Sequence, residues 1–534
     1  MQNYKLFNIL SLLLISIFVL TACRKDLPVL QPEHHAQEVS VQLQLQYSMK
    51  GIGSNKTKAA EYLDGQPDEN KITSLTIFII NLKPDSSLNW DSVKYATHYV
   101  QLTGENAEDI TFNINTNTGK KHIYIGANMT MHQIVSFCAN KGVYTSSGTT
   151  YTQTIGDFVD LSGRGIVMFG QAVMNDGSDN PIINITGLED ESNPLDTKLE
   201  LSRVVSKVAL TYEPNASDSE FVILANGTGS IKAENIYFML NNTAKSIDFI
   251  KGMDIDYSRY SMKDYLAYNS LNTFNPLLYY YKSNPISDFI LYTPSEFLPG
   301  VNTSNAYYTA KMQLPIDIVA GNENPYLKGL DEYIPPTANS GKHTHYNSSL
   351  YCLENTVSTA DFTPADSILD VRHGINTKVI VVAKYTPGIV LHYESGVILT
   401  PKTGLSESQM DAITNNDPNG DGTFYAVLKS SNPNTYEFYT YDAKEFINSN
   451  PPSEGLPQFI TYKGGYGYYA TFISQPTTNI EDDDNYNLYR NHYYILSVKE
   501  FTPPGAVYPQ DVYMMVNSET TDWLPGKSTT VIVE

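Results

Sequence analysis

The sequence predicts an all-β protein. Its 534 residues include 40 Tyr, 20 Phe, 33 Gly and 28 Pro, a mixture that favours strands separated by tight turns over long helices. Apolar and polar residues alternate with a period of two in several short segments, as in strands with one dry face. At roughly 100–200 residues per domain, the length and the 41% hydrophobic content suffice for two to four compact units.

The charge balance excludes whole classes of partner. The chain carries 35 Lys and Arg against 57 Asp and Glu, which gives a net charge of -22. A surface of that sign repels phosphate backbones and anionic lipid headgroups. We therefore expect no nucleic-acid partner and no attachment to membranes through a basic face.

The first residues predict export. Lys5 precedes an apolar run from Ile9 to Leu20, which is too short to cross a bilayer of roughly 30 Å and is typical of a signal peptide. The run ends in LTAC at residues 20–23, which resembles the lipobox of bacterial lipoproteins. This resemblance implies a signal peptide of residues 1–22, acylation of Cys23 (palmitate) and anchorage in outer-membrane lipid. The alternative is ordinary secretory cleavage with Cys23 incidental.

The segment after the leader predicts a strand followed by a cleavable loop. Val41, Leu43, Leu45 and Tyr47 alternate with three glutamines, which is the pattern of a strand with one dry face. Residues 50–59 (KGIGSNKTKA) show no periodicity and contain three lysines. Exposed loops of this kind are preferred sites of proteolysis.

Further strands are predicted along the rest of the chain. Residues 75–80 are apolar on both faces, which is typical of a central strand. The other predicted strands are residues 110–114, 122–129, 166–170, 199–210, 236–240, 377–385, 490–501, 512–516 and 529–533. One short helix is expected at residues 130–137. The turn-rich, acidic stretch 174–196 predicts a domain boundary near residue 195.

In this order the segments resemble the fimbrillins, the lipoprotein-derived pilin subunits of type V pili. Beyond the first strand, the loop and the second strand, the resemblance rests on residues 124–128 (YIGAN), 203–208 (RVVSKV), 351–356 (YCLENT), 462–469 (YKGGYGYY) and 489–494 (YRNHYY). Ser206 replaces an Ala of the family pattern. The resemblance implies two transthyretin-like β-sandwich domains and polymerisation by strand exchange, with copies of the chain and with other fimbrial subunits as partners.

The resemblance also implies a domain plan and a processing step. The signal peptide would be followed by a lipidated propeptide with a removable strand (23–58), an N-terminal sandwich (59–195), a C-terminal sandwich with long insertions (196–510) and a donor extension (511–534). Relatives are cut after Arg by a trypsin-like protease, whereas the matching position here is Lys58, before Ala59, with Lys50 as a second candidate. Either a lysine-directed protease acts, or this member is not processed and stays as an anchor or terminator.

Strand exchange has a physical basis in these segments. A lipid-held precursor would keep the 41–47 strand in its own first sandwich, and a cut in the loop would leave an apolar groove with unpaired backbone groups. The C-terminal end is the candidate filler because it is rich in β-branched and aromatic residues and is set off by prolines. The donor residues would be Val512, Met514, Val516, Trp523, Val531 and Val533. The alternative is that this hairpin completes its own domain.

No catalytic or metal constellation is predicted, and no cofactor. Residues 417–422 (DPNGDG) are similar to the start of a calcium loop, but Leu428 stands at the twelfth position, where Glu is needed, so a tight turn is favoured over a cation site. His343 and His345 lack a third ligand, and residues 481–484 (EDDD) fit a solvated acidic loop. Cys138 and Cys352 are expected to be buried small hydrophobes. An enzyme is not expected.

Two functions remain. The first is a structural shaft subunit of adhesive fimbriae, exported as an outer-membrane lipoprotein and then displayed in a cell-surface fimbrium. A non-polymerising tip or anchor subunit is a variant of this function. The second is an outer-membrane lipoprotein that binds glycans through its many Tyr and Asn side chains.

Overall fold

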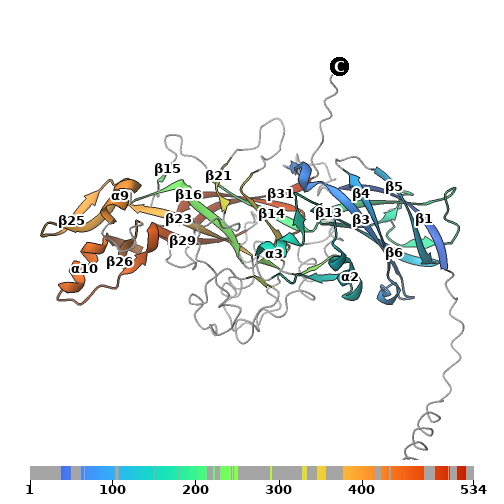
Figure 1. Ribbon diagram of the computed structural model, residues 1–534, viewed down its shortest axis with the longest axis horizontal. Coiled ribbons are helices and arrows are strands. Elements are labelled where there is room, and N and C mark those ends of the chain that lie inside the picture. The colour runs from blue at the N-terminus through green and yellow to red at the C-terminus, as the bar shows by residue number, and fades with distance from the viewer. Residues whose placement is uncertain are drawn as a thin grey trace, which may run out of the picture.

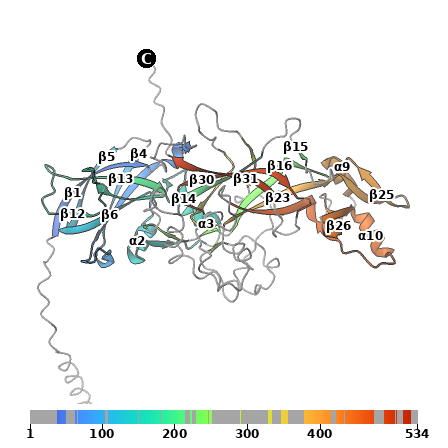
Figure 2. The same ribbon diagram turned by 180° about the vertical axis from the view of Figure 1, so that it is seen from behind.

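The computed structural model describes residues 38–49, 62–64, 66–102, 108–148, 151–178, 180–212, 220–222, 229–241, 243–244, 246–250, 289–290, 328–333, 346–355, 377–414, 422–431, 434–473, 488–502, 504–505 and 514–524. Strands dominate these residues, so the all-β prediction is confirmed. None of the helices among them is long and apolar enough to cross a membrane. The molecule is elongated, with β1 near one end and β25 and α10 at the other (Figures 1 and 2).

The first unit is a nine-stranded sheet with the order β4-β3-β6-β10-β13-β1-β5, in which β11 pairs with β13 and β12 pairs with β6. Its strands are β1 (Glu38–Met49), β3 (Ile72–Asn81), β4 (Lys94–Leu102), β5 (Glu108–Asn117), β6 (Gly119–Ala127), β10 (Met168–Gln171), β11 (Val173–Met174), β12 (Ile183–Ile185) and β13 (Leu195–Arg203).

Both faces of this sheet are buried where β3 runs. Leu75, Ile77 and Ile79 point into the core of the first unit. Phe78 and Ile80 belong to a second core on the opposite face, to which the short helix α2 (Met131–Ala139) contributes. Thr130 caps the start of the helix, and its hydroxyl accepts from the Gln133 backbone amide in a capping box. The apolar run of β3 and the helix were both predicted, and both are confirmed.

The second unit is built from two sheets that share one core. One sheet has the order β2-β31-β30-β14-β21, with β22 on β14, and the other has the order β15-β16-β23-β29, with β20 on β16. The strands of the first are β2 (Tyr62–Asp64), β14 (Val205–Tyr212), β21 (Asp331–Glu332), β22 (Ser349–Leu353), β30 (His492–Phe501) and β31 (Met514–Leu524). Those of the second are β15 (Glu220–Val222), β16 (Gly229–Asn241), β20 (Lys328–Gly329), β23 (Lys378–Pro387) and β29 (Tyr466–Phe472).

A smaller five-stranded sheet, β25-β24-β27-β26-β28, forms the far end of the molecule (Figure 1). It comprises β24 (Ile389–Glu394), β25 (Val397–Thr403), β26 (Phe424–Ser431), β27 (Asn434–Tyr439) and β28 (Ile460–Tyr462), with helices α9 (Glu407–Ile413) and α10 (Tyr441–Ser449). The short elements elsewhere are β7 (Val143–Thr145), α3 (Tyr151–Gly156), β8 (Val159–Asp160), β9 (Gly165–Ile166), β17 (Thr243–Ala244), β18 (Ser246–Asp248), β19 (Phe289–Ile290) and the 3-10 turns η1 (Pro67–Glu69), η2 (Trp90–Ser92) and η6 (Lys463–Gly465).

The passage between the two units corrects one prediction. Residues 199–210 were expected to form a single strand, but the chain changes sheets at Val204, between β13 and β14. Burial follows this change, since it alternates along β13 and is continuous in β14 up to Tyr212. The boundary predicted near residue 195 therefore coincides with the start of β13, which is still part of the nine-stranded sheet.

Candidate functional site: a strand slot and the contacts around it

The predicted removable strand is an interior strand of the first sheet. β1 pairs antiparallel with β5 from Glu38 to Tyr47 and parallel with β13 from Leu43 to Met49. Each neighbour therefore directs backbone hydrogen bonds at β1. Loss of β1 would leave a slot between β5 and β13 with two unpaired edges.

The side chains of β1 follow the predicted alternation. Val41, Leu43 and Leu45 are at most 1% exposed and lie in the core of the first unit, whereas Gln42 and Gln44 are half-buried. Full burial of three such aliphatic side chains contributes roughly 1.5–3 kcal/mol each. Tyr47 pairs through its backbone with Glu108 and Leu199, and its side chain lies outside what the structure describes.

The walls of the slot come from its two neighbouring strands. Phe112 and Ile114 of β5, and Leu199 and Leu201 of β13, are buried in the same core as β1. Thr197 adds a side-chain contact, because its hydroxyl donates to the Gln44 carbonyl at 3.1 Å. The slot is thus apolar inside and lined by backbone donors and acceptors along both edges, which suits a strand with one apolar face.

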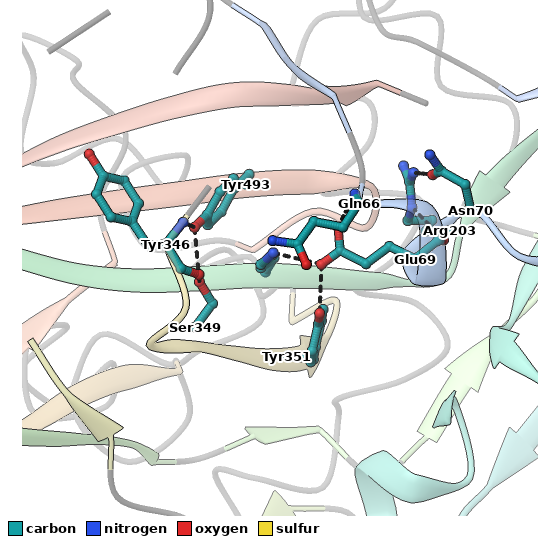
Figure 3. Close-up of polar contacts among 9 residues, drawn as sticks. Gln66, Glu69, Asn70, Arg203, Tyr346, Ser349, Tyr351 and Tyr493 are labelled. Atoms are coloured by element: carbon teal, nitrogen blue, oxygen red, sulfur yellow. Dashed lines mark hydrogen bonds and ion pairs between the residues drawn. The ribbon is translucent and has the colours of Figure 1, made fainter. Parts of the chain in front are cut away.

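A buried ion pair holds the chain shortly after the loop that the sequence predicts to be cleavable (Figure 3). Glu69, at the end of η1, is 1% exposed. Its carboxylate meets Lys207 Nζ at 2.6 Å and accepts hydrogen bonds from the Tyr351 hydroxyl at 2.6 Å and the Gln66 amide at 2.8 Å. Burial alone would raise the pKa of Glu69, but the charge of Lys207 and these hydrogen bonds together lower it below its ordinary value.

Arg203, the last residue of β13, contacts the same stretch of chain around Glu69. Its buried guanidinium donates to the side-chain oxygen of Asn70, to Asn491 Oδ1 at 3.3 Å and to the Glu69 carbonyl at 3.4 Å. Arg203 and Lys207 were singled out in one sequence motif. They lie on either side of the sheet change at Val204, so both units hold the chain at this point.

Asn128, which belongs to a second sequence motif, also holds this part of the chain. Its side-chain amide donates to the Lys71 carbonyl at 2.7 Å and to the Ile166 carbonyl at 2.8 Å, and its oxygen accepts from the Thr73 amide at 2.8 Å. Asn128 has a φ of 60°, a left-handed conformation that Asn tolerates better than most residues. We call residues 66–73, held by Glu69, Arg203 and Asn128, the clamped segment.

Two further motifs meet at a second buried ion pair. Arg490 Nε donates to Glu354 Oε2 at 2.8 Å, and its NH2 group contacts the other carboxylate oxygen. The same guanidinium donates to the carbonyls of Asp248, at 2.8 Å, and Phe249, at 3.3 Å. Beside this pair, Asn355 and Leu488 form an isolated antiparallel bridge. The sequence singled out Glu354 and Arg490 separately, and the structure brings them together.

The last motif holds the turn that precedes the C-terminal strand. The Tyr462 hydroxyl donates to the Gly505 carbonyl at 2.9 Å. Gly467 lies so close to this turn that a Cβ atom added there would stand 2.1 Å from the Pro504 carbonyl oxygen. We call Tyr462 and Gly467 with Pro504 and Gly505 the C-terminal clasp.

The buried His492 should make the protein less stable in acid. Its Nδ1 lies 2.8 Å from the Arg490 carbonyl, and burial lowers its pKa from about 6.5 to about 4. Between those values the unfolded chain binds a proton that the folded chain does not, so the free energy of unfolding should fall by about 3 kcal/mol as the pH drops from 7 to 4. Urea unfolding at pH 7, 5.5 and 4 measures this. His492→Gln should flatten the dependence by that amount, and an unchanged slope would contradict the assignment.

The C-terminal strand is paired within its own chain. β31, which contains Met514, Val516 and Trp523, lies antiparallel to β30 and parallel to β2. This is the alternative arrangement left open by the sequence, and donation to another subunit would require β31 to leave it. The predicted residues Cys23, Lys50, Lys58, Ala59, Val512, Val531 and Val533 lie outside the described residues.

Other predicted features are less prominent. Cys352 is buried, as expected, while Cys138 is half-buried; burial raises the pKa of both thiols. His343, His345, residues 417–421 and residues 481–484 lie outside the described residues. Over the part of the chain that the structure describes, no group of three or more His, Cys, Asp or Glu is placed to hold a metal.

The sequence did not predict several of the residues that hold the clamped segment or belong to it. Glu69 pairs with Lys207 and accepts from the Tyr351 hydroxyl, yet neither Glu69 nor Tyr351 was assigned a role, and Asn70 was not noticed. The available signal was weak: Pro67 starts a short acidic turn just before a strongly apolar strand. Nothing in the local sequence indicates that this acid is buried.

Comparison with known proteins gives two family matches that fit these units. Residues 39–203 match the family model of the major fimbrial subunit protein (FimA), and residues 460–531 match the C-terminal model of fimbrillin, the type IV major fimbrial subunit protein. The first match spans the nine-stranded sheet from β1 to β13, and the second includes β30 and β31. No curated protein matches the chain significantly.

Several solved structures of fimbrial proteins are also similar. A fimbrilin from Porphyromonas gingivalis aligns over 91% of this chain and 99% of its own, with 11% identity and a TM-score of 0.37. The C-terminally truncated tip fimbrial protein from the same organism aligns over 91% of this chain and 100% of its own, with 10% identity and a TM-score of 0.34. At such low scores these likenesses support no conclusion about function.

Proposed function

Because this chain belongs to the fimbrillin family of fimbrial subunits, we propose that it builds a cell-surface fimbrium by strand exchange. It is exported as a lipoprotein, anchored in the outer membrane through Cys23, and trimmed in the loop after β1. Trimmed subunits then polymerise into adhesive fimbriae, with other copies and other fimbrial subunits as partners.

One observation carries this proposal: an interior strand is linked covalently to the following strands only through residues 50–61. β1 lies between β5 and β13, and the sequence between it and β2 contains Lys50, Lys56 and Lys58. A single cut after Lys58, before Ala59, ends the covalent link. The slot that β1 leaves has an apolar floor and two unpaired edges, so a strand from outside would restore both the burial and the hydrogen bonds.

The filler we propose is residues 511–534 of a neighbouring copy. Val512, Met514 and Val516 repeat the period-two apolar pattern of Val41, Leu43 and Leu45, and an apolar strand face is what the slot accommodates. Val531 and Val533 offer a second, shorter match nearer the end of the chain.

The test combines processing and truncation. Amino-terminal sequencing of the surface-shed protein should give a chain that begins at Ala59, and the shed protein should form heat-resistant ladders in gels. Deletion of residues 511–534 should abolish the ladders, and Lys50→Gln with Lys58→Gln should leave the protein in the membrane fraction. Ladders formed by the deletion variant would show that the donor is a different segment, and a shed protein that stays monomeric would overturn strand exchange.

A further inference from the structure

We propose that the short strand β2 is a latch on the C-terminal strand, so that the cut that frees β1 also loosens β31. This inference rests on the proposed function. One proteolytic event would then prepare the subunit both to accept a strand and to donate one.

The pairing of β2 is the first step of the argument. Tyr62, Leu63 and Asp64 lie parallel to Asp522, Trp523 and Leu524, respectively. In the sheet order, β2 is outermost and β31 lies between β2 and β30. The outer neighbour of β31 is therefore a segment that begins only a few residues after the predicted cut at Lys58.

The clamped segment limits what the cut can loosen. Residues 66–73 are held by the Glu69–Lys207 ion pair, by Arg203 and by Asn128. The stretch with a new free end is therefore residues 59–65, which contains β2. A three-residue strand at a sheet edge, attached at one end only, opens readily, because short edge elements and chain ends have the lowest local stability in a fold.

The C-terminal clasp limits how much of the C-terminal part of the chain can move. Tyr462 of β28 and Gly467 of β29 hold Pro504 and Gly505, so the part that can move begins after Gly505. β2 pairs only with Asp522–Leu524. The register of β31 with β30 ends at Asp522, so without β2 the last residues of β31 lose their neighbouring strand. The strand would open first at Asp522–Leu524, where β2 had covered it, and this end leads directly into the tail with Val531 and Val533.

Hydrogen exchange of the intact and the cut precursor tests the latch. The cut is made with a lysine-specific protease and measured while β1 is still bound, so that the slot itself stays closed. Amides of residues 522–524, which pair with β2, should exchange about tenfold faster after the cut, while those of β14 keep their rate. Equal exchange in the intact and the cut chain would overturn the latch.

A variant of the uncut chain tests the effect of β2 on β31 separately from the effect of the cut. Leu63→Pro removes a backbone donor and disturbs the β2 pairing, so it should speed exchange in β31 of the uncut chain to a similar extent. The matched control is Lys328→Pro in β20, another short edge strand, which pairs with β16 and not with β31. If Leu63→Pro leaves exchange in β31 at the level of the control, β2 is not a latch.

The latch and the proposed function can fail separately. Ladders from a cut protein whose β31 exchange never changed would refute the latch and leave strand exchange standing. Faster exchange in β31 of a cut protein that stays monomeric would support the latch and refute strand exchange.

Discussion

Replacing Lys207 by Met should lower the free energy of unfolding by about 4 kcal/mol. The substitution leaves the Glu69 carboxylate buried with the Tyr351 hydroxyl and the Gln66 amide but without its cation. An unpaired buried charge is among the most destabilising changes that a single substitution can make. Urea unfolding of the uncut precursor at pH 7 measures the loss.

A double variant provides the control for the first prediction. Glu69→Gln with Lys207→Met removes both charges and should recover most of the lost stability, since a buried ion pair replaced as a whole is often close to neutral. Glu69 should also make the stability depend on pH. Its pKa is lowered in the folded protein, so its contribution to the free energy of unfolding is present at neutral pH and is lost as the pH falls into the acid range. If Lys207→Met lowers the free energy of unfolding by less than about 1 kcal/mol, the pair behaves as a solvent-exposed ion pair, and the prediction is wrong.

Leu43→Asp in β1 should expel the strand from its slot without any cut. Leu43 is fully buried in the core of the first unit, and a carboxylate placed there costs about 4 kcal/mol or more. The uncut precursor should then oligomerise, because the slot opens and a neighbour's residues 525–534, with Val531 and Val533, follow Leu524, the last residue that β2 pairs with. Native gels and size-exclusion chromatography measure the oligomers.

The matched control for this variant is Gln42→Asp. Gln42 is adjacent in the same strand but half-buried, on the opposite face, so the new charge reaches solvent and the precursor should stay monomeric. If the two aspartate variants behave alike, the dry face of β1 does not hold the strand in the slot.

The strands that could be predicted are those with a strong local pattern. The alternation of Val41, Leu43 and Leu45 determines which face of β1 is buried, and the two-faced apolar run of β3 reflects the two cores that it separates. By contrast, β2 is only three residues long and carries no period. The sheet at the far end was missed because β25 is mostly exposed and half-exposed and has no continuous dry face.

The contacts between motifs could not be predicted for a different reason. Arg203 lies far in sequence from Asn491, and Lys207 lies far from Tyr351. Only the fold brings each pair together, through a hydrogen bond in the first case and the pairing of β14 with β22 in the second. The sequence identified most of these residues individually, as elements of separate motifs. The sequence could not show that several of them meet at the clamped segment, just after the loop predicted to be cleavable.

The central claim is that the slot of β1 accepts any strand of the right pattern, and a synthetic peptide tests it most directly. Trimmed subunits, freed of β1, are mixed with a peptide of residues 38–49 or with the same peptide carrying Asp at positions 43 and 45. The account predicts that the first peptide binds one to one and suppresses the ladders, and that the second does neither. Trimmed subunits that bind neither peptide and remain monomeric would contradict it.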